Sequence, residues 1–158
     1  MANIPPQQLG QDYYNAAFLL TEIIQHRNCE DYRLTNPTLF LYRHSIELML
    51  KAAIGKKNNT HRLDDLIDDF ADSVKRELDE DLPSWIVARI KELAKIDPGS
   101  TAFRYSENRD KTAKKGPPVY IAVDGEFYVD LLYLQSTMKA LNTAITELCN
   151  KMGVHSWY

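Results

Sequence analysis

Cysteine and glycine are both scarce in this sequence, and their scarcity excludes several kinds of site. The only cysteines are Cys29 and Cys149, which stand far apart and have no metal-ligand spacing. Neither lies in a pattern typical of a catalytic nucleophile. The six glycines form no phosphate-binding loop. The sequence therefore predicts a reduced, cytoplasmic protein with no cofactor and no metal site.

Long apolar runs and a strong excess of charge are also missing. The longest apolar stretches are only a few residues, which excludes a transmembrane helix and a membrane partner. The first residues lack the basic and apolar regions of a secretory signal. The net charge of −3 gives no overall nucleic-acid signature. At 158 residues, 44% of them hydrophobic, the chain is expected to form a single domain, residues 1–158.

The most informative stretch spans residues 36–57 and predicts a long, mostly apolar helix. Asn36 is suited to capping its start, Pro37 to its first position and Gly55 to its end. At about 100° per residue, apolar side chains cover more than half of its circumference. The remaining polar stripe consists of Arg43, His44, Glu47 and Lys51. A helix this apolar is normally buried, so the stripe must pair internally or line a cleft.

Four further helices are expected from hydrophobic periodicity and stop signals, at residues 11–28, 60–78, 84–96 and 131–152. Ser84 and Asp130 are the expected caps of the last two. In the first helix, the expected core stripe is Tyr13, Ala16, Ala17, Leu20, Ile23 and Ile24. In the helix at 84–96, the expected inward side chains are Trp85, Ile86, Ile90, Leu93 and Ala94.

The region before the last helix has a different pattern. Residues 98–118 predict a loop, and residues 119–123 and 126–129 predict two strands joined at Asp124-Gly125, a strong hairpin signal. The predicted fold class is mainly α. Its architecture is an up-and-down bundle of four to five helices with one small β-hairpin before the last helix.

The polar stripe supports two interpretations. Arg43, Glu47 and Lys51 are spaced four residues apart, which is typical of an ion-pair ladder on a helix. The same spacing could instead form the wall of a cleft. There, His44 could act as a general acid or base and Arg43 could hold a phosphate.

Two other segments add candidate residues. His61 and Arg62 begin a helix, where the imidazole could cap or catalyse and the guanidinium could contact an anion. The loop from residue 104 to 115 has five basic residues against two acidic ones, a balance that favours phosphate contact or simple solvation. Arg104 lies in this loop, and Tyr105 could stack on a base. The aspartates of residues 64–72 are interpreted as a solvated acidic face rather than a metal site.

Three segments together resemble HEPN-domain proteins: residues 42–52 (YRHSIELMLKA), 60–66 (THRLDDL) and 102–105 (AFRY). The resemblance covers roughly residues 10–150. It implies an up-and-down helical bundle, often a homodimer, in a toxin–antitoxin, defence or RNA-processing system. It also implies a nucleotidyltransferase or antitoxin-like partner.

Many HEPN-domain proteins are metal-independent ribonucleases. Their signature is an arginine followed, after roughly four to six residues, by a histidine. No arginine in this sequence is followed by a histidine at that spacing. This departure favours a non-catalytic member of the family.

We therefore interpret the chain as a non-catalytic HEPN-like domain that binds a partner protein or the phosphate of a nucleotide or RNA. The expected ligand-binding residues are Arg43, Glu47, Lys51, Arg62, Arg104 and Tyr105. One alternative is a metal-independent ribonuclease that uses His44 or His61 as acid–base catalyst. The other is a purely structural dimerisation module whose polar stripe is satisfied internally.

Overall fold

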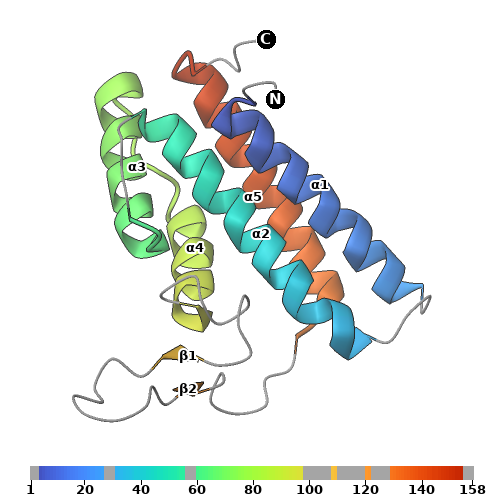
Figure 1. Cartoon of the computed structure of the whole chain (residues 1–158). Coiled ribbons are helices and arrows are strands. Elements are labelled where there is room, and N and C mark those ends of the chain that lie inside the picture. The colour runs from blue at the N-terminus through green and yellow to red at the C-terminus, as the bar shows by residue number, and fades with distance from the viewer. Residues whose placement is uncertain are drawn as a thin grey trace, which may run out of the picture.

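The computed structural model describes residues 4–26, 31–55, 60–97, 108–109, 120–121 and 129–154. Within these ranges it contains five helices and two short strands (Figure 1). The helices are α1 (Pro6–Gln25), α2 (Asp31–Ile54), α3 (Leu63–Leu78), α4 (Ser84–Ile96) and α5 (Leu131–Lys151). The strands are β1 (Asn108–Arg109) and β2 (Tyr120–Ile121). The prediction of a mainly helical bundle is confirmed.

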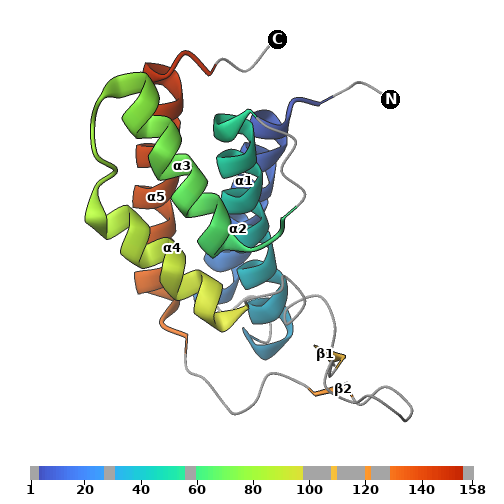
Figure 2. The ribbon, with the colours of Figure 1, turned by 90° about the vertical axis from the view of Figure 1, so that its left-hand side faces the viewer.

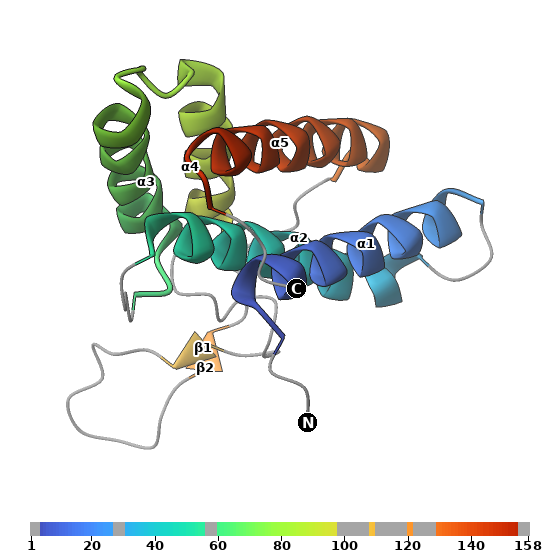
Figure 3. The same ribbon diagram turned by 90° about the horizontal axis from the view of Figure 1, so that it is seen from above.

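Helix α2 lies at the centre of the bundle. It packs along α1 and also contacts α3 and α5. Figure 2 shows α3 and α4 as a pair beside α2, and Figure 3 shows α5 lying over α1 and α2. Because α2 has neighbours on several sides, it needs the broad apolar surface that its sequence predicts.

Helix α1 begins earlier than expected and turns a different face to the core. It starts at Pro6, a residue suited to a first helical position, and ends at Gln25 rather than at residue 28. The predicted stripe is partly wrong, because Ala16 is exposed and Ile23 is 39% exposed. The buried residues are Gly10, Tyr14, Ala17, Thr21 and Ile24. A small glycine and a threonine that bonds within the core do not register in a hydrophobic pattern.

The start of α2 was also predicted wrongly. The helix begins at Asp31, so Asn36 lies inside it rather than at its cap, and Pro37 is interior. Pro37 lies past the first turn of α2, where a proline removes one backbone hydrogen bond from the helix. Leu34, in the additional turn, is half-buried. The predicted end is close: α2 ends at Ile54, and Gly55 has the positive φ of 67° that a terminating glycine supplies.

Helices α3 and α4 follow the predicted periodicity closely. The predicted core residues of α3 are all buried: Leu63, Leu66, Ile67, Phe70 and Val74. In α4, Ile86, Ile90 and Ala94 are buried, but Trp85 is 42% exposed. Ser84 is the first helical residue rather than the cap, a position that Pro83 occupies.

Helix α5 begins as predicted, whereas the hairpin before it is not supported. The Asp130 carboxylate accepts a hydrogen bond from the Tyr133 amide at 2.9 Å, which confirms the predicted cap. Strand β2 pairs antiparallel with β1, which lies in the predicted loop. Residues 119 and 122–128 of the predicted hairpin lie outside the described residues. The Asp-Gly signal predicts a two-residue turn, whereas this pairing joins Arg109 to Tyr120 across a longer connection.

Candidate functional site

The candidate site is built on a buried ion pair within α2. Arg43 and Glu47 lie one helical turn apart, and both side chains are only 1% exposed. Arg43 Nη1 donates to Glu47 Oε2 at 3.1 Å. Since a buried charge without a partner is costly, the two residues stabilise each other inside the bundle.

The remaining nitrogens of Arg43 bind to other elements. Its Nε donates to the backbone oxygen of Asp97 at 3.2 Å and lies 3.6 Å from that residue's Oδ2. Its Nη2 donates to the backbone oxygen of His61 at 2.7 Å. One guanidinium therefore ties α2 to the residue after α4 and to the segment before α3. All three of its nitrogens are occupied, so Arg43 is part of the scaffold and offers a ligand no open side.

Glu47 is the meeting point of the other basic groups. Its Oε1 lies 2.7 Å from His61 Nδ1 and 3.0 Å from Lys51 Nζ. Its Oε2 lies 3.9 Å from His44 Nδ1. Burial alone would raise the pKa of Glu47, but His44, His61 and Lys51 outweigh it and hold the pKa well below 4.5, its ordinary value. Glu47 is therefore a stable carboxylate at neutral pH.

Only part of this cluster reaches the surface. The His61 side chain is 58% exposed and that of Lys51 is 19% exposed, whereas Glu47 beneath them is 1% exposed. Arg62, beside His61, is 63% exposed. We call these three basic residues, Lys51, His61 and Arg62, the basic rim. It lies where the end of α2 meets the start of α3.

His44 occupies a more enclosed position than His61. Its ring stacks on Phe40 at 5.5 Å and meets Tyr13 edge-on at 4.7 Å. The side chain is 17% exposed, and within the described ranges its buried Nδ1 has no hydrogen-bond partner. His44 thus acts mainly as an aromatic ring in the packing between α1 and α2.

The structure brings together most of the predicted site residues. Arg43, His44, Glu47, Lys51 and His61 form one cluster, as both interpretations of the stripe require. Arg62 is beside the cluster, but its Nε contacts Asp65 at 3.8 Å. Arg104 and Tyr105 lie outside the described residues.

Sequence reasoning missed Asp97 and the backbone acceptors. Asp97 is 1% exposed and close to Arg43, although its sequence context indicates only the end of a helix. The carbonyl groups that bind Arg43 are invisible to residue patterns. The one available signal was the presence of an arginine on an apolar helix, which must find acceptors somewhere.

Comparison with known proteins adds no relative. No family model, curated protein or solved structure matches the chain, and the HEPN-like assignment stays a prediction. In the part of the chain that the structure describes, no helix is long and apolar enough to cross a membrane. Over the same ranges, no three His, Cys, Asp or Glu side chains are arranged to hold a metal ion.

Proposed function

We propose that the chain is a non-catalytic, HEPN-like domain that binds the phosphate of a nucleotide or RNA at the basic rim. The observation that carries this proposal is the gathering of basic groups around one buried carboxylate. Lys51 and His61 share a single oxygen of Glu47, and both reach the surface.

Glu47 is shared by several basic groups, two of which reach the surface at this opening. Arg43 is balanced by Glu47 and Asp97, which lie 3.1 Å and 3.6 Å from it. Glu47 also accepts from Lys51 and contacts His61 through its other oxygen. A phosphate at this opening would accept charge-assisted hydrogen bonds from the Lys51 and Arg62 side chains, both of which reach the surface.

The rim also has donors to offer. An ammonium group has three N–H donors, and the hydrogen bond from Lys51 to Glu47 uses one of them. The Nδ1 of His61 faces Glu47, so its Nε2 is the nitrogen that a ligand would meet. Arg62 adds an exposed guanidinium at the same edge. No arginine of the cluster is both enclosed and free to stabilise a transition state, and this favours binding over catalysis.

The biological setting follows from the sequence resemblance and belongs to the same proposal. It is a cytoplasmic, homodimeric protein of a toxin–antitoxin, defence or RNA-processing system. A nucleotidyltransferase or antitoxin-like protein would be its partner.

Binding of a fluorescein-labelled single-stranded oligoribonucleotide, measured by fluorescence anisotropy, tests the proposal. The double variant Lys51→Gln/His61→Gln should bind at least tenfold more weakly and show a shallower salt dependence, because it makes fewer phosphate contacts. Lys75→Gln is the matched control, since Lys75 is exposed at the far end of α3. Equal binding by the double variant and the control would contradict the proposal, as would the absence of binding to the unmodified chain.

One contact favours a second candidate, the metal-independent ribonuclease. A carboxylate that binds one imidazole nitrogen leaves the other oriented for proton transfer, and His61 lies 2.7 Å from Glu47 in this way. Cleavage of labelled RNA in EDTA, lost in His61→Ala and kept in His26→Ala, would establish this activity. Cleavage that persists in His61→Ala would reject it. If the chain neither binds nor cleaves RNA, the structural dimerisation module is the remaining candidate.

A further inference from the structure

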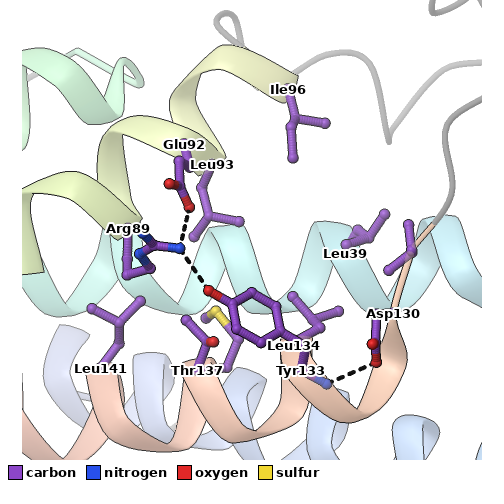
Figure 4. A pocket seen from close by; sticks show the side chains of 12 residues that line it. Leu39, Arg89, Glu92, Leu93, Ile96, Asp130, Tyr133, Leu134, Thr137 and Leu141 are labelled. Atoms are coloured by element: carbon purple, nitrogen blue, oxygen red, sulfur yellow. Dashed lines mark hydrogen bonds and ion pairs between the residues drawn. The ribbon is translucent and has the colours of Figure 1, made fainter. Parts of the chain in front are cut away.

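A cavity lies between α4 and α5, above the first half of α2, and Figure 4 shows its lining. Its volume is about 200 Å³. Its apolar wall includes Leu39, Leu93, Leu134, Met138 and Leu141. None of its lining residues belongs to the cluster around Glu47, so it is a separate feature of the molecule.

A hydrogen-bonded bridge crosses one end of this cavity. Arg89 Nη1 on α4 donates to the Tyr133 hydroxyl on α5 at 2.6 Å. The same nitrogen lies 2.8 Å from Glu92. Figure 4 shows the Tyr133 ring extending along the cavity between its two helices. The cavity thus has an apolar body with a polar end at the Arg89–Tyr133 bridge, and the Asp130 carboxylate lies away from that bridge.

The charged side chains of the lining are Arg89, Glu92 and Asp130, which leave one net negative charge. The guanidinium of Arg89 is paired with Glu92, and the carboxylate of Asp130 accepts the Tyr133 amide at the start of α5. An anionic ligand group would find Arg89 already paired and would be repelled by the surplus carboxylate, and burying any ionised group costs solvation. The lining therefore disfavours an anion, and its largely apolar surface suits a neutral ligand with a hydrogen-bonding group that reaches the Tyr133 hydroxyl.

The volume selects for size. A dry apolar cavity of about 150 Å³ holds benzene, and sites for drug-sized molecules begin near 300 Å³. At about 200 Å³, this cavity fits one or two fused rings and is too small for a nucleotide. A flat ring also suits the wall formed by the Tyr133 ring and the Met138 thioether.

We propose that the cavity between α4 and α5 binds a neutral aromatic molecule of about the size of indole. The ring lies on Leu93, Leu134 and Met138. Its hydrogen-bonding group meets the Tyr133 hydroxyl at the polar end. This site is independent of phosphate binding at the basic rim.

Methyl NMR with indole as the probe tests the proposal directly. The chain has four methionines, and Met138 is the one that lines the cavity. With ¹³C-methyl methionine labelling, indole should move the Met138 signal by its ring current, saturably, with a Kd on the order of 1 mM or tighter for so small a ligand. Met49 and Met152 are internal references whose signals should stay in place.

Two neighbouring substitutions supply the matched control. Thr137→Phe places a ring in the cavity wall and should weaken indole binding at least tenfold, whereas Ser136→Phe places the same ring at an exposed position and should not. If Thr137→Phe fails to fold, Leu134→Phe replaces it. An unmoved Met138 signal overturns the proposal, as does equal indole binding by the two phenylalanine variants. A Met138 signal that shifts with protein concentration alone also overturns it, because a second copy of the chain would then occupy the cavity.

Discussion

Replacing Glu47 by glutamine tests the physical basis of the whole cluster. The substitution keeps the shape and one acceptor oxygen but removes the charge. Arg43 would then be buried, 1% exposed, without its nearest carboxylate, and Lys51 and His61 would lose their shared partner. Removing one member of a buried ion pair costs about 3–5 kcal/mol. Since glutamine still accepts one hydrogen bond, we expect a loss of about 3 kcal/mol.

Urea and thermal unfolding at pH 7, followed by circular dichroism, measure this loss. At about 2–4 °C per kcal/mol for a chain of this size, the Tm should fall by roughly 6–12 °C. The matched control is Glu92→Gln, because Glu92 also pairs with an arginine, at 2.8 Å, but is 52% exposed. An exposed pair contributes under about 1 kcal/mol. A loss below 1 kcal/mol for Glu47→Gln, equal to the control, would refute the reasoning.

The pH dependence of the stability of the unmodified chain and of Glu47→Gln adds a second check. The folded chain holds the pKa of Glu47 below its ordinary value of 4.5, which is the value expected after unfolding. The unfolded chain therefore binds more protons in acid, and the contribution of Glu47 to stability is lost as the pH falls below about 4.5. The stability difference between the unmodified chain and Glu47→Gln should shrink over that range. A difference that stays constant down to pH 3 would show that the charge of Glu47 is not its source.

Three further predictions concern the scaffold. Gly10→Val should destabilise the fold by about 1–3 kcal/mol in urea unfolding, because even a Cβ at Gly10 would come within 2.9 Å of Met49 Cγ. The control, Ala16→Val on the exposed face of α1, should be nearly neutral. In a Cys29→Ser background, Cys149 should react with Ellman's reagent only after unfolding. Burial raises the pKa of the Cys149 thiol to about 11, and the thiolate is the reactive form. Rapid reaction of the folded protein would contradict the buried position of Cys149. Asp130→Ala should cost about 1 kcal/mol, because the Tyr133 amide loses its cap, and Asp72→Ala on the exposed face of α3 should not.

Sequence periodicity was a good guide wherever apolar side chains alone decide which face is buried. In α3, the stripe from Leu63 to Val74 is buried as predicted. In α1 the pattern was right at Ala17 and Ile24 but incomplete, because the core there also uses Gly10 for close approach and Thr21 for a 3.2 Å contact with the Tyr42 hydroxyl. Neither role adds hydrophobicity, so a count of apolar residues cannot find them.

The polar stripe was predictable as a set of residues but not as a geometry. Four residues on one sector of an apolar helix had to find partners: Arg43, Glu47 and Lys51 pair by charge, whereas His44 packs against aromatic rings. What the pattern could not show is the direction of each side chain. Arg43 turns inward to two backbone carbonyl groups, and Lys51 and His61 reach the surface. Tertiary packing brings those acceptors close to Arg43, and no residue spacing in the sequence predicts their position.

The inward and outward parts of the cluster therefore separate stability from binding. Arg43 Nη2 holds the backbone oxygen of His61 at 2.7 Å, so the buried pair fixes the position of the residue that carries the exposed imidazole. Glu47 then orients that imidazole through Nδ1. Substitutions at Arg43 or Glu47 should impair folding and ligand binding together. A substitution at Arg62, which is 63% exposed and does not contact Glu47, removes only charge at the rim, so it should impair binding while the unfolding transition stays in place.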